Sequence, residues 1–335
     1  MARIVLGLAS SHTPLLALSA ADWAHRAAVD RANPALNLSD GRLLNYAQLL
    51  AEVGPRHADV ITAEVLDRKK RACDAAIETL ADALQAAAPD VAIIVGDDQA
   101  ELFGAAVQPA LSVFHGDTMV MLDKYGREGT PSWLRQVGHD YLMDAAHAVT
   151  AAPAFALEII GGLIDREVDV TSLALVPDPS RAAFGHAFGF IVKRLFRGRA
   201  IPVVPLLLNT YFPPNVPSAA RCHRVGRALA EVVADIAGPQ RVAVIASGGL
   251  SHFVVDEALD RGLLHAMQTR DARWLSGIPR GALNSGSSEI LNWVLAAGAL
   301  ESLELTWSDY QPLYRTPAGT GVGAGFAIWK PPEAP

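Results

Sequence analysis

The residues best suited to chemistry come directly after short apolar segments of the chain. His12 follows the segment 3–9, Asp97 and Asp98 follow 91–95, and His252 follows 241–246. Imidazole and carboxylate groups bind metal ions and move protons near neutral pH. A single histidine after a strand is more often a hydrogen-bonded turn residue. Two histidines and a double aspartate at the same end of several strands favour a site.

The elements that would position these groups follow from the pattern of apolar residues. Buried strands are predicted over 3–9, 91–95, 201–208 and 241–246, and helices over about 63–88, 219–237 and 288–297. This alternation predicts an α/β fold with one domain over residues 1–330, in which helices flank a central, mostly buried sheet. Ligands of such sheets bind at the carboxyl ends of the strands. We expect an irregular segment over 22–39, a Pro-rich loop at 213–217 and a tail at 331–335.

Composition narrows the class of protein. The chain has 335 residues, of which 51% are hydrophobic and 19% charged, with a net charge of -7. Without a long basic run or about 18 consecutive apolar residues, we expect neither nucleic-acid binding nor a membrane span. Cys73 and Cys222 lie far apart, so the default location is a reducing cytoplasm. The low charge content favours extra buried surface and hence a homo-oligomer, with a dimer as the first expectation.

Glu289 is ambiguous from its neighbours alone. The segment 285–289 opens an apolar helix, so the local pattern favours capping by Ser287 or Ser288, with the Glu289 carboxylate stabilised by the helix dipole. Gly248 and Gly249, just before His252, permit either a tight turn or a close approach to a ligand.

Four short segments resemble, in order, the motifs of the class III extradiol ring-cleavage dioxygenases, the LigB superfamily. They are Ser-Ser-His-Thr-Pro at 10–14, Gly-His-Ala-Phe-Gly at 185–189, Gly-Gly-Leu-Ser-His at 248–252 and Ser-Gly-Ser-Ser-Glu at 285–289. The resemblance extends from residue 3 to about residue 329. The segments 96–99, 185–189 and 314–321 look most similar to the gallate and 3-O-methylgallate dioxygenase branch.

The resemblance implies a LigB-like fold and an Fe(II) enzyme with O2 as co-substrate. The implied substrate is a substituted or carboxylated catechol, of gallate or protocatechuate type, whose ring opens beside the hydroxyls. It also implies roles for individual residues. His12 and Glu289 would be metal ligands, His252 the base that takes a hydroxyl proton, and His186 a hydrogen-bond partner of substrate or oxygen.

One position departs from the family pattern. Gln99 stands where the family carries its second histidine ligand. The amide oxygen of Gln99 is a weaker ligand for Fe(II) than imidazole, so Asp98, Glu101 or His57 are alternatives for completing the site. The departure also leaves open a metal-dependent hydrolase or lyase on the same scaffold, or a non-catalytic binding subunit.

Recognition of a substrate carboxylate would suit arginine, which binds carboxylates through two parallel hydrogen bonds. Arg315 and Tyr314 are the leading candidates for substrate binding because they lie in a motif segment. Arg181, Tyr211 and Tyr310 are further candidates.

Overall fold

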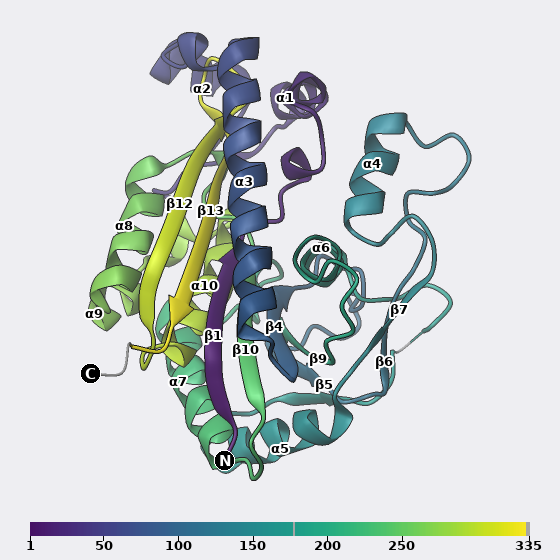
Figure 1. Cartoon of the computed structure of the whole chain (residues 1–335). Helices are drawn as coiled ribbons and strands as arrows, with labels where there is room; N and C mark the ends of the chain where they lie inside the picture. Colours follow the sequence, from purple (N-terminus) through teal and green to yellow (C-terminus); the bar gives the residue numbers. More distant parts are fainter. Residues whose placement is uncertain (177, 333–335) are drawn as a thin grey trace.

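The strands most rich in β-branched and aliphatic residues form the middle of one large sheet. The computed structural model, which describes residues 1–176 and 178–332, has a nine-stranded mixed sheet in the order β11-β13-β1-β10-β4-β9-β5-β8, with β12 paired to β13 (Figure 1). Its strands are β1 Arg3–Ser10, β4 Val91–Asp97, β5 Leu111–Phe114, β8 Thr171–Leu173, β9 Val203–Leu208, β10 Arg241–Ser247, β11 His252–Val254, β12 Glu304–Tyr314 and β13 Thr320–Lys330.

The four strands predicted from the sequence are β1, β4, β9 and β10, and all four are confirmed. They pair in parallel as neighbours, β1 with β10, β10 with β4 and β4 with β9. Their side chains are buried almost throughout because helices cover both faces of the sheet. Parallel pairing brings their carboxyl ends to one edge of the sheet, which we call the rim. His12 lies there after β1, Asp97 at the end of β4, and the turn before His252 after β10.

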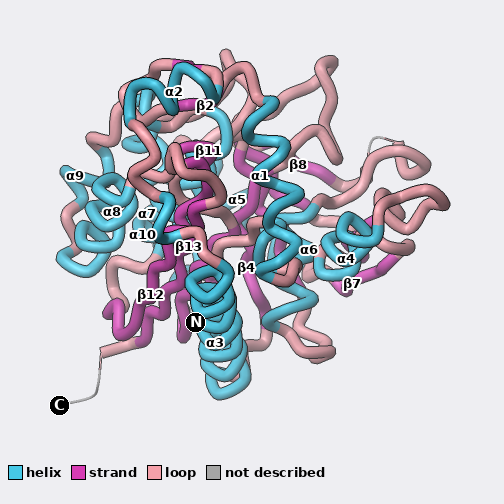
Figure 2. Tube along the Cα trace, turned by 90° about the horizontal axis from the view of Figure 1, so that it is seen from above, coloured by secondary structure: helices cyan, strands magenta, loops and turns pink. Residues whose placement is uncertain are grey.

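Helices cover both faces of this sheet (Figure 2). One face packs against α5 Pro153–Ile164, α7 Ala219–Asp235, α8 Glu257–Thr269, α9 Ala272–Ser276 and α10 Ile290–Ala299. The other packs against α1 Trp23–Ala32, α3 Ala63–Ala87, α4 Ser132–Asp140 and α6 His186–Leu195. Cys222 and Cys73 are free, buried thiols in these two separate core clusters. The α/β fold expected from the sequence is confirmed.

Two of the three predicted helices are confirmed as α3 and α7, while the third begins differently. Residues Ser285–Glu289 form a 3-10 segment, η5, and α10 starts only at Ile290. The predicted apolar face of α3 is buried. The helix ends at Ala87 and is followed by Ala88, which has a left-handed backbone (φ 41°) just before Pro89. The loop at 213–217 contains no helix or strand, as expected.

Two parts of the fold were not predicted. The segment 22–39 is not irregular, because it contains α1 and the short strand β2 Leu36–Asn37, which pairs with β3 Leu43–Leu44. A further helix, α2 Tyr46–Val53, follows. The long β12–β13 hairpin was also missed, although it supplies one side of the sheet. The expected tail is described only at 331–332, and residues 333–335 lie outside the described chain.

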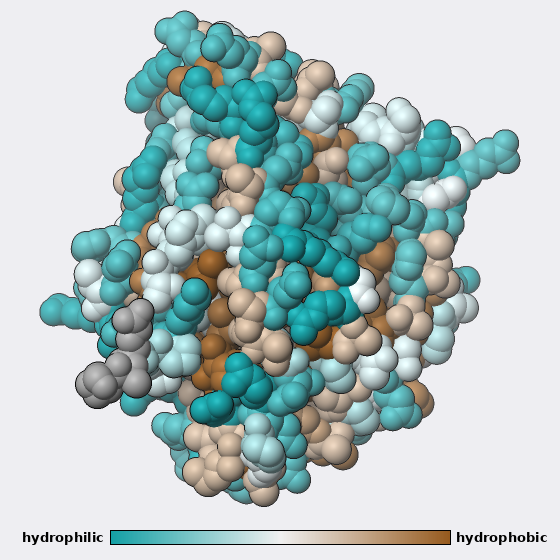
Figure 3. Space-filling view, in the orientation of Figure 1, coloured by the Kyte–Doolittle hydropathy of each residue, from teal (hydrophilic) through white to brown (hydrophobic). Residues whose placement is uncertain are grey.

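A small lobe stands beside the main sheet. It comprises residues 115–150 and contains β6 Thr118–Met121, α4 and β7 His147–Thr150, with β6 and β7 paired to each other (Figure 1). We call it the α4 lobe. On the face seen in Figure 3, hydrophilic residues predominate and hydrophobic residues show only in separate areas. Within the described residues, no helix has both the length and the apolar character needed to cross a membrane.

Candidate metal centre

Four buried side chains converge at the rim of the sheet. They are His12, which follows β1, Asp97 at the end of β4, His186 at the start of α6 and Glu289 at the end of η5. Each offers a nitrogen or oxygen atom, and these atoms lie within 4.8 Å of one another. A group of two imidazoles and two carboxylates this close together is able to hold a metal ion.

His12 is oriented through its outer ring nitrogen. The Ser247 hydroxyl donates to the carbonyl oxygen of Ala187 at 2.6 Å, so it accepts from Nδ1–H of His12 at 2.9 Å. This arrangement leaves Nε2 as the lone-pair nitrogen. Nε2 lies 3.2 Å from Glu289 Oε2, yet it has no aligned hydrogen-bond partner among the described residues. An inward lone pair, fixed by a hydrogen bond on the opposite nitrogen, is the usual state of a metal-binding histidine.

The two carboxylates are held at the centre of the cluster by hydrogen-bond donors from α10 and from the loop after β10. Asn292 Nδ2 donates to Asp97 Oδ1 at 3.2 Å, and the backbone N–H of Gly249 donates to Glu289 Oε2 at 2.6 Å. Glu289 makes no helix cap, so the capping interpretation is wrong: η5 turns its side chain into the cluster instead. Burial and the nearby Glu289 carboxylate raise the pKa of Asp97 to about 6.

Gln99, the predicted third ligand, lies beside both carboxylates. Its side-chain nitrogen donates to Asp97 Oδ2 at 3.3 Å and to Glu289 Oε1 at 3.2 Å. Rotation of the amide by half a turn would present its oxygen instead, since the two ends have the same shape. Coordination by Gln99 therefore stays a prediction.

The alternatives to Gln99 are engaged elsewhere. The Asp98 carboxylate accepts the backbone N–H groups of Glu101, Leu102 and Phe103, so it closes the turn after β4. The ring of His57 stacks on Tyr314 at a centroid distance of 4.1 Å. Neither side chain belongs to the cluster.

Glu101 acts on the cluster indirectly, through His186. Its carboxylate lies 2.9 Å from His186 Nδ1, and the His186 ring packs edge-on against His12 with centroids 4.6 Å apart. Burial alone would lower the pKa of His186, but the Glu101 carboxylate outweighs it and raises the pKa to about 9. At neutral pH His186 is therefore an imidazolium, which donates hydrogen bonds and does not offer a lone pair.

His252 lies next to the cluster with the opposite character. Its Nδ1–H donates to the carbonyl oxygen of Leu250 at 2.8 Å, and its Nε2 lies 3.8 Å from Glu289 Oε2. Burial lowers the pKa of His252, and the Glu289 carboxylate opposes this only in part. The ring is neutral at pH 7, with Nε2 able to accept a proton. A Cβ at Gly249 would overlap this ring, so the glycine is needed for close approach.

The turn just before His252 is stabilised by the buried carboxylate of Asp260. Asp260 accepts from the backbone N–H of Ser251 at 2.8 Å, from the Ser251 hydroxyl at 2.7 Å and from the Tyr310 hydroxyl at 2.7 Å. Tyr310 is thus part of the support of the turn. Three donors on one carboxylate fix the path of the chain just before His252.

Neither predicted substrate-binding residue is one of the four clustered side chains, although the Arg315 charge is near enough to help lower the pKa of His252. Arg315 is buried and binds the Asp30 carboxylate with two hydrogen bonds of 2.7 and 3.0 Å. The Tyr314 hydroxyl donates to Glu257 at 2.8 Å. Arg315 therefore joins α1 to the β12–β13 hairpin. Tyr211, by contrast, is near enough to Glu289 and Asp97 for both to raise its pKa, together with burial.

The sequence pointed to Asp97 only as half of a double aspartate and did not predict it as a metal ligand. Neighbouring residues at the end of a strand point to opposite sides, so only one of Asp97 and Asp98 faces the rim. The signal was the burial pattern: every residue of β4 up to Asp97 is apolar or glycine, so an acid that continues the strand is buried.

The cluster fits a divalent cation. Two buried carboxylates repel each other, and His12 Nε2 points at them without an aligned hydrogen. A bound cation would neutralise the repulsion between the carboxylates and would also give His12 Nε2 a partner. Of the four groups, His12, Asp97 and Glu289 have inward atoms free to coordinate, whereas the Glu101 carboxylate favours the protonated form of His186.

Comparison with known proteins agrees with this geometry. A model of the family described as the catalytic LigB subunit of aromatic ring-opening dioxygenase matches residues 49–326. A search of curated proteins gives no significant match. The matched region contains Asp97, His186, His252 and Glu289, and it covers most of the sheet. The chain therefore belongs to the LigB family of aromatic ring-opening dioxygenase catalytic subunits.

Proposed function

We propose that the protein is an Fe(II)-dependent extradiol dioxygenase, which uses O2 to open the ring of a substituted or carboxylated catechol beside its hydroxyls. The observation that carries this proposal is the buried group of His12, Asp97 and Glu289, flanked by one imidazolium and one neutral imidazole. Family membership supplies the reaction class. The finer assignment to catechols of gallate or protocatechuate type rests on the resemblance of the segments 96–99, 185–189 and 314–321.

The metal ligands in this proposal are His12, Glu289 and Asp97, with Gln99 beside them. Imidazole and carboxylate oxygens suit Fe(II), and three such ligands leave positions for other molecules. Asp97 would supply the bond that the family's second histidine otherwise makes. Gln99 would coordinate through its amide oxygen or stay hydrogen bonded to the two carboxylates.

Bound Fe(II) would supply the Lewis acidity that lowers the pKa of the catechol hydroxyls, and the redox chemistry toward O2. The remaining steps belong to the chain. His252 accepts a hydroxyl proton at Nε2, because Leu250 holds the proton on Nδ1. His186 donates from the side opposite Glu101 and stabilises negative charge on the reacting oxygens. Two histidines with pKa values moved apart supply an acid and a base at the same pH.

The test is oxygen consumption by protein loaded anaerobically with Fe(II). A panel of catechol, 3,4-dihydroxybenzoate and gallate is added, and O2 uptake is measured together with loss of the aromatic absorbance. We expect one O2 consumed per ring opened with at least one compound. Absence of uptake on every compound, with one equivalent of Fe(II) verified in the protein, would refute the proposal.

A metal-dependent hydrolase or lyase is the second candidate. The observation that favours it is that Gln99, beside the carboxylates of Asp97 and Glu289, stands where a second histidine ligand was expected. Carboxylate and amide oxygens also suit Mn(II) and Zn(II). It predicts turnover of an aromatic ester or acid without O2 after loading with Zn(II) or Mn(II). Assays in an anaerobic chamber separate the two candidates.

The same proposal includes a cytoplasmic homodimer that acts on small aromatic molecules. Leu157 and Ile164 are both exposed, and they lie on one side of α5 because they are seven residues apart. A second subunit that packs against this side of α5 would bury both side chains. Light scattering after size-exclusion chromatography gives the mass. A mass close to that of one 35.5 kDa chain would remove the dimer from the proposal.

A further inference from the structure

The backbone just after His252 is strained. Phe253, the next residue, has a left-handed backbone with a φ of 63°, a conformation that is unfavourable for an aromatic residue. Strain of this kind persists only where the surrounding structure holds the chain in place, and it is common at functional sites. The contacts that hold this turn therefore bear on the role of His252.

Ser251, the residue just before His252, has every polar group engaged. Its N–H and its hydroxyl both donate to the Asp260 carboxylate, at 2.8 and 2.7 Å. Its hydroxyl oxygen accepts the backbone N–H of Asp256 at 2.9 Å, and its carbonyl oxygen accepts the backbone N–H of Gly323 at 2.8 Å. Ser251 is buried, so any shift of this residue would leave buried polar groups without partners.

The Asp260 carboxylate is itself fixed against the β12–β13 hairpin. The Tyr310 hydroxyl, on β12, donates to Asp260 Oδ2 at 2.7 Å. A Cβ at Gly323, on β13, would lie 1.9 Å from the same oxygen, so the carboxylate packs directly on the backbone of that strand. Asp260 belongs to α8 and is fully buried. It therefore ties the turn before His252 to both α8 and the hairpin.

The position of the His252 ring depends on the path of its own backbone. The ring lies between two glycines, because a Cβ at Gly249 would lie 2.1 Å from its Cε1 and a Cβ at Gly286 would lie 2.5 Å from its Cγ. Its Nδ1–H donates to the carbonyl oxygen of Leu250, which belongs to the same turn. A shift of the turn would therefore carry the ring with it.

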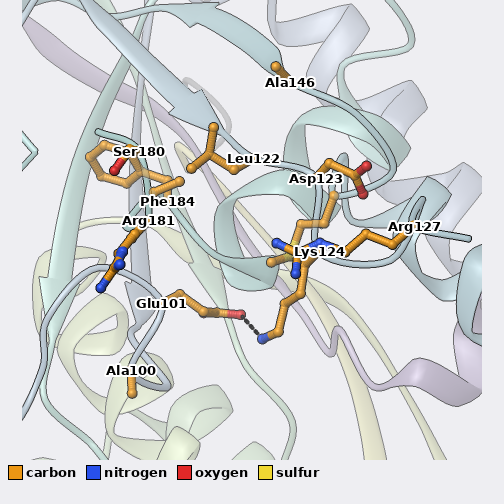
Figure 4. Close-up of a pocket in the computed structure, with 12 residues that line it drawn as sticks. Ala100, Glu101, Leu122, Asp123, Lys124, Arg127, Ala146, Ser180, Arg181 and Phe184 are labelled. Carbon is orange, nitrogen blue, oxygen red and sulfur yellow. Dashed lines mark ion pairs between the residues drawn. The ribbon is translucent and has the colours of Figure 1, made fainter. Parts of the chain in front are cut away.

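His186 is supported in a different way. The Glu101 carboxylate lies 2.9 Å from Nδ1 of its ring, and Figure 4 shows Glu101 in its ion pair with Lys124. A side chain thus holds the His186 ring directly. Within the part of the chain that the structure describes, the His252 ring has no side-chain hydrogen bond of this kind, so its support comes through the backbone of the turn.

We propose that Asp260, secured by Tyr310, is the positioning residue of His252: its hydrogen bonds to Ser251 hold the turn so that His252 Nε2 faces the metal cluster. Asp260 is not one of the clustered side chains, so it acts only through the turn. The proposal rests on the proposed function in one respect, because it takes His252 as the base. An Asp260 that only stabilised α8 would leave the His252 ring unaffected, and two measurements separate these roles.

The first measurement uses metal-free full-length protein, so that it does not depend on catalysis. Histidine is labelled with ¹⁵N, and the ring nitrogens of His252 are identified by the signals that disappear in His252→Gln. In the wild type at neutral pH we expect the two shifts of a single tautomer with the proton on Nδ1, since Leu250 accepts that proton. In Asp260→Asn, and more weakly in Tyr310→Phe, the two shifts should move toward each other as both tautomers become populated.

The control for these nitrogen shifts is Asp271→Asn, which replaces an exposed residue that caps α9. It should keep the wild-type shifts of His252. Unchanged shifts in Asp260→Asn overturn the proposal, and Tyr310→Phe decides in its place if Asp260→Asn does not fold.

The second measurement is a double-mutant cycle in the Fe(II)-loaded enzyme, with the catechol of the panel that reacts fastest. We expect Asp260→Asn to lower kcat by about tenfold with normal metal content, because a misplaced base accepts the proton slowly. In the His252→Gln background the same substitution should lower kcat no further, because the residue that it positions is gone. Equal losses in the two backgrounds overturn the proposal. If the wild-type enzyme opens no ring, the proposed function fails, and the nitrogen shifts still decide the role of Asp260.

Discussion

The rim side of the metal cluster and its lobe side are held by different parts of the chain. On the rim side, His12, Asp97 and Glu289 are fixed by Ser247, Asn292 and Gly249, which belong to the central strands or pack directly on them. On the lobe side, the support of His186 is Glu101, which also faces a cavity with exposed cations from the α4 lobe. A rigid rim suits metal binding, and a more exposed lobe suits substrate selection.

The largest expected effect comes from the rim. Glu289→Gln keeps the shape of the side chain but removes the charge that faces His12 and accepts from Gly249. We expect metal content to fall well below one equivalent and kcat/KM to fall by roughly 10³-fold. Metal analysis and O2 uptake measure both, with the exposed Glu64→Gln as control. Full metal content in Glu289→Gln would show that the rim does not hold the ion.

His252→Gln separates proton transfer from metal binding on the same side. The variant loses the Nε2 atom that accepts the hydroxyl proton, while His12, Asp97 and Glu289 are untouched. We expect kcat to fall by about 10²- to 10³-fold with normal metal content. His265→Gln, on the exposed side of α8, serves as control. Equal loss of metal and of activity would instead make His252 a ligand.

The sequence alone predicts some residues of the cluster well and others poorly. The rim histidines follow strands whose apolar pattern is plain, so His12 and His252 could be found without a structure. Glu289 needed the family resemblance, because its neighbours predict a helix cap. Asp97 was hidden beside Asp98, since only the strand's pleat decides which of the two faces the rim.

The parts that escaped prediction depend on contacts between distant residues. Asp30 looks like a polar residue in an irregular stretch, but it is buried because Arg315, 285 positions away, binds it. In β13, Gly321, Gly323 and Gly325 lower the strand propensity, yet each lets another part of the chain approach closely. The cavity lined by Glu101, Lys124 and Phe184 likewise combines residues from four separate segments.

Replacing Arg315 tests whether this residue binds substrate or stabilises the fold. Arg315→Met would leave the buried Asp30 carboxylate without its partner, so we expect a loss of about 3 kcal/mol in the free energy of unfolding. Denaturant titration measures it. Arg261→Met, which breaks an exposed pair with Glu257, should cost less than about 0.5 kcal/mol. A raised KM with an unchanged free energy of unfolding would instead support a role of Arg315 in substrate binding.

Glu101→Gln gives a smaller effect on the lobe side. The Glu101 carboxylate holds the pKa of His186 near 9, so the protonated form needed for donation is lost only as the pH rises through that value. Without the carboxylate this pKa falls, and we expect the basic limb of the kcat profile to move to lower pH. At pH 8 the rate should fall by about tenfold or less, with metal content unchanged. A basic limb that stays in place would exclude His186 as the titrating acid.

The central claim is that Asp97 and Glu289 share a buried cation with His12, and Asp97→Asn tests it most directly. Thermal unfolding is followed for wild type and variant, without metal and after one equivalent of Fe(II) under anaerobic conditions. Because burial and Glu289 raise the pKa of Asp97, its charge destabilises the metal-free fold at pH 8. We predict that the metal-free variant is more stable than wild type, on the order of 1 kcal/mol, and no longer responds to Fe(II). A variant with unchanged metal-free stability and the full wild-type response to Fe(II) would contradict the account.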